Sequence, residues 1–564
     1  MGAQRPGTPV LTGAVPPLAP FYLARQETGS VLAGGLRPGE TTLLRPALPG
    51  AGGTGTTQLA VGFAHALWSA RAVDLLAWVP AGRRSAVIAG YAQAAADLEL
   101  LPGGEAAPGI AASTADRAAG RFLDWLRTTG RRWVVVLDGV AAPADLDGLW
   151  PQGPAGQAVA TSSLTEAELS APGPGGAVTR QAVHGFSRRE ALGYLNTRLT
   201  GFPDQRIEAL DLAEDLGGRP SAVALAAAVI SATEGSCRAY RAQYAARLSS
   251  VADTVVDNCP PSLLATWSLA VEHAHQLAPA GLSWPALVLA AALDTGGIPA
   301  AVLTSPAACA FIAGQQAAPG PDPAAGGPQL VRAAYANLER LGLLSVDSAS
   351  PVRTVWLHSA VRSAVRAYLA PGNVEKVVAA AAAALLEAWP AAGSPGSGPQ
   401  LSQALRDSAA ALRDWAGDRL WQPDAHPLLL RAGESLTEPP ALADSAVGYW
   451  QALGAASNQL LGYGHAQSAL ARQRLADAHA AAGRMQDAIP LYERVVTDGA
   501  ALADPGDIDA LTARCNLATA YFKAGRMTDG VRVLRAVLAD CELHLGREHP
   551  MTSTVRENLQ AATE

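Results

Sequence analysis

The sequence predicts a multidomain protein in which an amino-terminal α/β domain with a parallel sheet precedes a helical remainder that ends in an α-solenoid of repeated hairpins. Three observations support this organisation. The 564 residues are too many for one ordinary hydrophobic core. Strand and helix patterns alternate between residues 41 and 163, which is typical of a parallel sheet covered on both faces. Beyond Leu199, amphipathic helical segments follow one another.

Composition and charge argue against several classes of protein. The chain has 42 Lys and Arg against 49 Asp and Glu, a net charge of −7, and no basic run typical of a nucleic-acid binder. Five scattered cysteines without a C-x-x-C pair argue against a disulfide framework or a zinc site. The apolar run 377–389 is shorter than the roughly 20 residues that span a bilayer. We therefore expect a cytoplasmic protein without a membrane segment.

The predicted α/β domain follows a Pro/Gly-rich stretch. Residues 1–30 have little periodicity and are interpreted as a tail or an arm packed on the first domain. Apolar runs predict strands at 41–48, 72–81, 131–140 and 156–163, and helical patterns lie at 56–70, 86–100 and 115–129. The short connections between them favour a parallel order of strands.

The loop between the first predicted strand and helix has the layout of a phosphate-binding loop. In "PGAGGTGTTQLA" the pattern G-x-x-x-x-G-K-[ST] is met by Gly50, Gly55 and Thr57, but Thr56 stands in place of the lysine. Gly52 and Gly53 add the freedom that lets backbone N–H groups surround phosphates at a helix amino terminus. The alternative interpretation is a tight turn without a ligand.

Two further residues complete the expected site. The Thr57 hydroxyl and Asp138, which follows the apolar run "WVVVL", are the residue types that hold magnesium beside a nucleotide. Thr56 supplies no charge to the phosphates, so hydrolysis is expected to be weak or absent. Arg45, Arg83 and Arg84 are arginines that could compensate, although the sequence does not place them.

The remainder of the chain shows a hairpin unit and an internal repeat. Between about 255 and 370, helical stretches lead to two short apolar strands around a Ser/Pro turn and then a helix (343–369), an order that predicts a winged-helix-like unit. The stretch "PAAGSPGSGPQ" (390–400) is a predicted linker. Similar segments begin at Leu475 and Leu517, a period of 517 − 475 = 42. Each is a helix, a Gly-Arg turn and a second helix, and such hairpins must stack to bury their apolar faces.

Three arginines, Arg472, Arg514 and Arg556, recur with the same period. They face acidic side chains of a binding partner, or they pair with acids of the neighbouring repeat; the sequence leaves both open.

Together these motifs resemble the signal-transduction ATPases with numerous domains (STAND), of the NB-ARC type found in plant immune receptors, apoptotic-protease activators and many actinobacterial regulators. The similarity covers roughly Leu32 to Leu369 and continues into tetratricopeptide repeats. The resemblance implies that three domains close around ADP, that exchange for ATP opens the molecule and drives assembly, and that the repeats sense a ligand or hold the switch closed.

The resemblance also implies a domain plan and two further nucleotide contacts. Pro220 in "GGRPSAVAL" would lie against the adenine, and His358 in "WLHSAV" would touch the β-phosphate of ADP. The expected domains are an arm (1–30), a P-loop NTPase-like domain (31–184), a helical subdomain (185–250), a winged-helix-like domain (251–372), a helical connector (373–455) and tetratricopeptide repeats (456–564).

The departures from the family pattern are equally specific. Besides Thr56, Gly139 stands where a second acid usually follows Asp138, Ser163 occupies the sensor-arginine position, and Ser359 replaces the aspartate after His358. These losses favour a regulatory scaffold with a degenerate P-loop, a pseudo-NTPase, over an active enzyme.

Two alternatives remain open at this point. One is a functional ADP/ATP switch, with magnesium, that oligomerises on activation; the other is a winged-helix transcriptional regulator, which the acidic balance and the two arginines of "HSAVRSAVRAYL" disfavour. For both the scaffold and the switch, we expect a protein or peptide partner to bind the groove of the repeats. Neither nucleic acid nor a membrane is expected as a partner.

Overall fold

The chain divides into two compact units in the computed structural model. The first comprises residues up to 102 together with 116–417, and the second is formed mainly by residues 418–564. The structure describes residues 8–25, 32, 36–47, 52–100, 114–164, 177–201, 203–256, 259–294, 296–315, 327–391, 398–437, 442–500 and 507–563.

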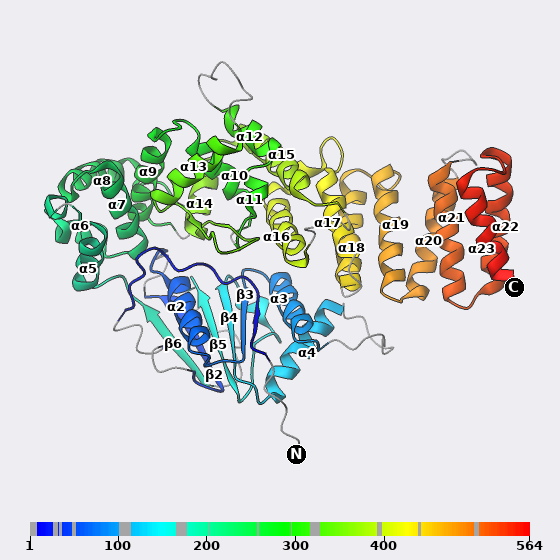
Figure 1. The fold of residues 1–564 in the computed structure, drawn as a ribbon, viewed down its shortest axis with the longest axis horizontal. Helices are drawn as coiled ribbons and strands as arrows, with labels where there is room; N and C mark the ends of the chain where they lie inside the picture. Colours follow the sequence, from blue (N-terminus) through cyan, green and yellow to red (C-terminus); the bar gives the residue numbers. More distant parts are fainter. Residues whose placement is uncertain are drawn as a thin grey trace. The chain divides into compact units, whose positions relative to one another are not determined.

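A six-stranded parallel sheet forms the amino-terminal part of the first unit (Figure 1). Its strands are β1 (Val10–Thr12), β2 (Glu40–Pro46), β3 (Leu75–Pro80), β4 (Trp133–Val140), β5 (Gly156–Ser162) and β6 (Ala177–Val183). Their order in space is β1-β3-β4-β5-β2-β6. The register between β4 and β5 shifts between Leu137 and Val140, next to Asp138.

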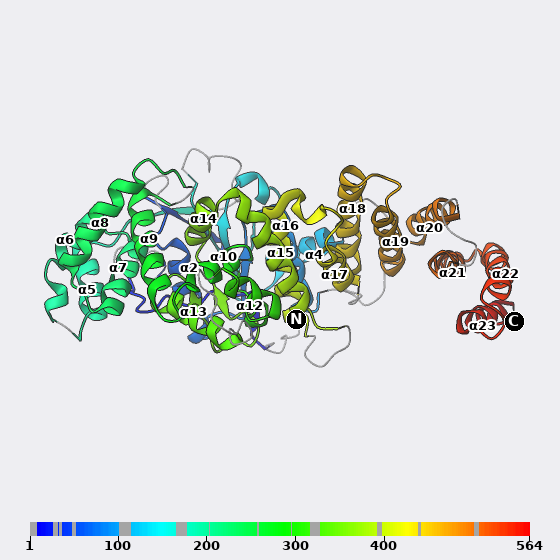
Figure 2. The same cartoon turned by 90° about the horizontal axis from the view of Figure 1, so that it is seen from above.

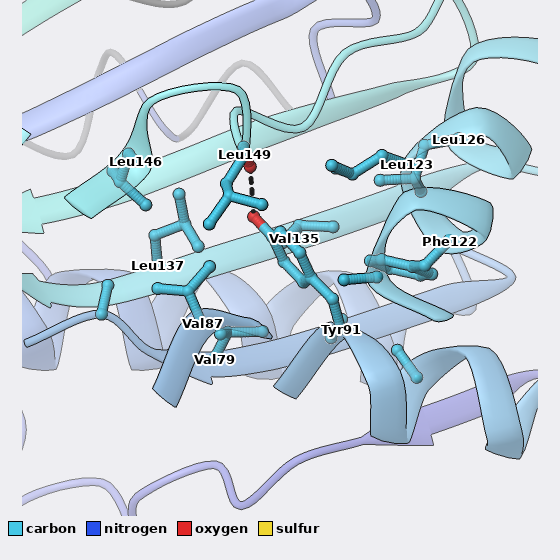
Figure 3. Close-up of a cluster of buried hydrophobic side chains, with 14 of the residues drawn as sticks. Val79, Val87, Tyr91, Phe122, Leu123, Leu126, Val135, Leu137, Leu146 and Leu149 are labelled. Carbon is cyan, nitrogen blue, oxygen red and sulfur yellow. Dashed lines mark hydrogen bonds between the residues drawn. The ribbon is translucent and has the colours of Figure 1, made fainter. Parts of the chain in front are cut away.

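Helices cover both faces of this sheet. On one face α2 (Thr56–Ser69) packs Leu59 and Phe63 against Trp78 of β3. On the other, α3 (Arg84–Asp97) and α4 (Thr114–Thr128) enclose a second core, shown in Figure 3. There the buried Tyr91 hydroxyl donates to the Leu149 carbonyl oxygen at 2.9 Å. The predicted parallel α/β fold class is confirmed.

The predicted strands and helices of this domain are all present, and two strands were not predicted. β1 lies within the amino-terminal stretch, so the described part of that stretch is an arm anchored at the sheet edge. β6 forms the opposite edge beside β2. A run of three residues is too short to show a strand period, and an edge strand need not be a continuous apolar run.

Helices and one short hairpin make up the rest of the first unit. β7 (Ser345–Val346) and β8 (Val355–Trp356) form the antiparallel hairpin, with Ile298 bridged to Val355, and α14 follows directly, as predicted for a winged-helix-like unit. Residues 392–397 of the predicted linker lie outside the described residues. The helices are α5 (Arg188–Arg198), α6 (Ala209–Asp215), α7 (Pro220–Thr233), α8 (Cys237–Val251), α9 (Pro261–Gln276), α10 (Ser283–Ala291), α11 (Ala300–Leu303), α12 (Pro306–Ala313), α13 (Pro328–Arg340), α14 (Ser359–Tyr368), α15 (Pro371–Ala388) and α16 (Pro399–Ala416).

The second unit is a series of stacked helices, visible in Figures 1 and 2. The helices are α17 (Pro427–Thr437), α18 (Ala443–Leu460), α19 (Ala466–Ala481), α20 (Met485–Ala500), α21 (Ile508–Lys523), α22 (Met527–His544) and α23 (Pro550–Thr563). α19 with α20 and α21 with α22 are the two predicted hairpins. Each helix contacts the next along the chain, which confirms the predicted solenoid.

The structure shows a second recurring element, at the start of α19 and of α23. "LGYGHAQS" begins at Leu461 and "LGREHPMT" at Leu545, and 545 − 461 = 84 is twice the 42-residue period. In both, a histidine Nδ1 accepts the backbone N–H two residues later, at 3.3 Å for His465 and 3.2 Å for His549. The first helix of alternate repeats therefore begins with the same cap.

The three periodic arginines pair within the solenoid. The Arg472 Nη2 lies 3.4 Å from an Asp498 oxygen, the Arg514 Nη1 donates to Asp540 at 2.6 Å, and the Arg556 Nη2 donates to Glu542 at 2.8 Å. Arg472 and Arg514 pair with an acid on the second helix of their own hairpin, and Arg556 pairs with an acid of the preceding repeat. The pairing is thus structural, but for two of the three arginines it lies within one repeat and not between neighbouring repeats as the sequence suggested. Among the described residues, no helix is long and apolar enough to cross a membrane.

Candidate functional site

The glycine-rich loop leads directly into α2. Gly53 (φ 78°) and Gly55 (φ 85°) lie in the left-handed region that favours glycine. Gly55 is the N-cap of α2 and no side chain caps this helix, so its first backbone N–H groups lack that partner. A helix amino terminus of this kind attracts phosphate through these N–H groups and the helix dipole. Gly50, the first glycine of the motif, lies outside the described residues.

Thr57 and Asp138 lie together at the end of β4. The Thr57 hydroxyl donates to an Asp138 carboxylate oxygen at 2.9 Å, and the Thr161 hydroxyl donates to the same oxygen at 2.6 Å. Burial raises the pKa of Asp138, and the two hydroxyl hydrogen bonds oppose that shift. In the described part of the chain no group of three or more His, Cys, Asp or Glu side chains gathers to hold a metal. One carboxylate and one hydroxyl suit a magnesium ion whose other ligands are phosphate oxygens and water.

The helical part of the first unit donates hydrogen bonds to carbonyl oxygens of the glycine-rich loop. α7 begins at Pro220, and the next residue, Ser221, donates its backbone N–H (3.2 Å) and its hydroxyl (3.0 Å) to the Gly53 carbonyl oxygen. The Arg219 Nη1 donates to the Gly52 carbonyl at 3.3 Å. A Cβ atom on Gly53 would lie 2.0 Å from the Ser221 hydroxyl oxygen. This approach requires glycine at position 53.

Arg25 of the arm reaches the same loop. Its guanidinium donates to the Thr54 carbonyl and, at 2.7 Å, to the His184 carbonyl, and it lies 5.1 Å from the centre of the Phe186 ring. Burial lowers the pKa of Arg25, while the Glu190 carboxylate and Tyr22 raise it. Sequence reasoning missed this residue, because "FYLARQ" matched no pattern that was applied to it.

The arm runs across the first turn of α2. Gln58 accepts the Ala19 N–H at 2.7 Å and donates to the Pro17 carbonyl at 3.2 Å, which fixes the arm on the first turn of the helix. The Tyr22 hydroxyl lies so close to Gly62 that a Cβ there would approach it to 2.6 Å. The described residues of the arm therefore pack on the α/β domain.

His358 is the N-cap of α14, and its ring has one nitrogen left for a ligand. Its Nδ1 accepts the Ala360 N–H at 3.1 Å, so in the neutral ring the proton is on Nε2. The ring lines the cavity, and the surrounding protein lowers the pKa of His358, which favours this neutral form. The Nε2–H group is thus a donor available to an anion.

One cavity of about 230 Å³ brings several predicted residues together. Gly53, Gly55, Pro220 and His358 all line it, although they are up to 305 residues apart in the sequence (358 − 53 = 305). Its wall is largely apolar and includes residues from the arm, α7, α9 and α14 and from within or just before α5 and the β7–β8 hairpin: Phe21, Tyr22, Phe186, Tyr194, Leu225, Leu263, Trp267, Leu343, Trp356 and Val361. A flat apolar group next to a phosphate-binding loop is the ligand that such a wall suits.

Two of the arginines considered as substitutes for the lysine lie elsewhere. Arg83 contacts Asp414, and Arg84 donates to the Asp147 carbonyl at 2.8 Å. The structure thus corrects the suggestion that either reaches the loop. In the described part of the loop, Arg25 donates to the Thr54 carbonyl and Arg219, the residue before Pro220, donates to the Gly52 carbonyl.

The uncharged replacements are located as the sequence implied. Gly139 (φ 78°) follows Asp138 and donates its N–H to the Thr161 hydroxyl at 2.8 Å. Ser163 is exposed just after β5, and Ser359 is the exposed first residue of α14. Thr56, Gly139, Ser163 and Ser359 therefore add no charge to the site.

Comparisons with known proteins agree on the repeats. A tetratricopeptide repeat family model matches residues 510–550, which confirms this type of repeat at the carboxyl end. No curated protein sequence matches the chain.

Three solved structures are similar to the chain. One is a Signal Transduction ATPase with Numerous Domains (STAND) protein with a tetratricopeptide repeat sensor from Pyrococcus horikoshii, at 13% identity and a TM-score of 0.45, covering 97% of this chain and 78% of that one. A putative kinesin light chain from Podosopora anserina with nearly identical TPR-like repeats is 26% identical, with a TM-score of 0.22, covering 24% of this chain and 63% of that one. The ORC2 protein of Aeropyrum pernix, in ADPNP–ADP complexes, is 14% identical, with a TM-score of 0.24, covering 65% of this chain and 96% of that one.

Proposed function

We propose that this protein is a STAND-like regulatory protein that binds an adenine nucleotide, ADP or ATP with magnesium, in the cavity beside the glycine-rich loop. The observation that carries the proposal is the shared cavity: Gly53 and Gly55, Pro220 and His358 come from three parts of the chain and line one space. The loop would take the phosphates, Pro220 and the apolar wall the base, and the His358 Nε2–H group a phosphate oxygen. Thr57 and Asp138 would hold magnesium.

Hydrolysis is expected to be weak or absent. Thr56 brings no cation to the terminal phosphates, and neither Gly139 nor Ser163 supplies the acid or the arginine expected beside them. Arg25 and Arg219 donate to carbonyl oxygens of the loop, so they stabilise its shape. A bound nucleotide would accordingly regulate the protein and would not be turned over. The same proposal includes the domain boundaries that the sequence predicts.

The tetratricopeptide repeats would bind a protein or peptide partner, in the cytoplasm. The first alternative, a working ADP/ATP switch that oligomerises, shares the same cavity and differs in turnover and assembly. DNA binding by the winged-helix-like unit is less well supported, because Arg366 of α14 points inward: its Nε donates to the Ala291 carbonyl at 2.8 Å, and burial, followed by Arg362, lowers its pKa to about 9.

The test begins with the nucleotide content of the purified chain. The protein is heat-denatured, its supernatant is separated by anion-exchange chromatography, and the emptied protein is titrated calorimetrically with ADP and ATP in the presence of magnesium. Gly55→Glu places a carboxylate in the loop and should abolish binding. Gly120→Glu on α4, where a Cβ would meet no atom within 4 Å, is the matched control and should bind as the wild type does.

Each outcome bears on a stated part of the proposal. Nucleotide that co-purifies, or binding that only Gly55→Glu removes, supports the site. An empty protein that gives no heat with either nucleotide would overturn it. Phosphate release at a rate of about 1 s⁻¹ or faster, within the range of ordinary enzymes, would overturn the claim of a degenerate site and favour the active switch.

A further inference from the structure

The helix that ends the first unit, α16, is held by charged contacts to two other parts of that unit. At its carboxyl end, Asp414 pairs with Arg83, which follows β3 of the α/β sheet. The two side chains are 47% and 42% exposed, so water reaches this ion pair. It joins residues that are 331 positions apart (414 − 83 = 331).

A second contact joins the same helix to the winged-helix-like part. Arg353, in the loop of the β7–β8 hairpin, pairs with Asp407 of α16 and lies 3.7 Å from Asp294. Its side chain is only 16% exposed, and it also donates to the Gly296 carbonyl at 2.7 Å. Burial, followed by the Asp407 charge, raises the pKa of Asp294, and Arg353 opposes both effects. Arg353 therefore fixes α16 to the hairpin.

A third contact comes from α14. The Arg366 guanidinium lies 4.8 Å from the centre of the Trp415 ring while it donates to carbonyl oxygens of α10 and the residue after it. Asp407 and Asp414 are seven positions apart, about two helical turns, so they share one side of α16, while Trp415, the next residue, lies about 100° further around the helix. Side chains from three separate elements meet α16.

We propose that α16 is a latch that holds the α/β domain and the winged-helix-like domain together, and that the Arg83–Asp414 pair is its releasable end. The buried Arg353 contact keeps α16 on the hairpin when the latch opens. An exposed ion pair is weak and is screened by salt, so its loss changes the closed population by about twofold to fivefold. A contact of that size can be broken and remade.

The position of α16 in the chain gives this latch its significance. The helix ends at Ala416 and is capped by Gly417, and the second unit, with the tetratricopeptide repeats, starts at the residue after that cap. Asp414 lies four positions before the start of the second unit in the sequence (418 − 414 = 4). The releasable end of α16 is therefore the end that is next to that unit along the chain.

Hydrogen–deuterium exchange of the full-length protein tests this proposal. In Arg83→Asp the ion pair becomes a repulsive pair of acids, and exchange in the peptide covering 399–416 should accelerate on the order of tenfold. The charge swap Arg83→Asp with Asp414→Arg should return it to within about twofold of the wild type. Arg127→Asp, at a comparably exposed pair with Asp124 on α4, should leave α16 unchanged.

Because Arg83 is partly exposed, we expect these variants to fold, which circular dichroism of each variant checks first. Raising the salt concentration from 0.05 to 0.5 M should accelerate exchange in α16 of the wild type and of the charge swap, and slow it in Arg83→Asp, whose repulsion is screened. Unchanged exchange in Arg83→Asp would overturn the latch. So would acceleration that the swap does not reverse, or equal acceleration in Arg127→Asp.

Discussion

Replacing Gly53 by alanine tests whether α7 is docked on the glycine-rich loop. Any L-residue at φ 78° costs about 1–2 kcal/mol. The new Cβ would also lie 2.0 Å from the Ser221 hydroxyl oxygen. Ser221 must then give up its 3.0 Å hydrogen bond, about 1 kcal/mol, and leave its rotamer, about another 1 kcal/mol. The docked state therefore loses about 2 kcal/mol beyond the backbone cost, roughly 30-fold in its population.

Gly139 provides the matched control for this experiment. It has the same φ of 78°, but a Cβ there would meet no atom within 4 Å. Exchange at the Ser221 N–H, which donates to the Gly53 carbonyl, should accelerate in Gly53→Ala and stay nearly unchanged in Gly139→Ala. In a Ser221→Ala background the effect of Gly53→Ala should shrink to that of Gly139→Ala. Equal exchange in the two glycine variants would refute the docking.

Three further predictions concern the cap histidine, the arm and the repeats. The protein around His358 withdraws water from the ring and lowers its pKa below the usual value of about 6.5, so the unfolded chain binds the proton more readily and thermal stability should fall as pH drops below about 7. His358→Asn, which can keep the cap, should weaken that dependence, and an identical pH profile would count against it. Arg25→Gln removes the guanidinium that donates to two carbonyl oxygens, so the arm should open more often and chymotrypsin should cleave after Tyr22 about tenfold faster. Unaltered cleavage would show that Arg25 does not hold the arm. Gly530→Ala should lower the melting temperature of the repeats, because its Cβ would lie 2.3 Å from a phenylalanine ring. Gly448→Ala, in open space on α18, should raise the melting temperature. A shift of the melting temperature in the same direction for both variants would contradict this packing.

The sequence predicted those parts of the fold whose signals are local and repeated. The apolar runs of β2 to β5 are long enough to stand out, and the 42-residue period identified the hairpins α19–α20 and α21–α22 without any tertiary information. β1 and β6 were not predicted, because an edge strand is defined by its hydrogen bonds to the neighbouring strand more than by a hydrophobic pattern of its own. In β1, three residues are also too few to show the alternation of a strand.

The site divides along the same line. Gly53, Gly55, Pro220 and His358 belong to local motifs, and the fold brings all of them to one cavity. The arginines do not follow local patterns, because a long side chain finds its partner through the tertiary structure. The sequence suggested Arg45, Arg83 and Arg84. Of these, Arg83 and Arg84 pair at other places, and it is Arg25 that reaches the loop from the arm.

The three donors on the glycine-rich loop have a consequence for the opposite side of its backbone. A peptide group is planar, so fixing the direction of a carbonyl also fixes the N–H of the next residue, which points the other way. The carbonyls of Gly52, Gly53 and Thr54 are held by Arg219, Ser221 and Arg25, respectively. The directions of the N–H groups of three successive residues, 53 to 55, are thereby fixed by side chains on the carbonyl side of the loop. The arm and the helical subdomain thus set the shape of the loop in advance, and a change in either one would be felt as a rotation of its peptide planes.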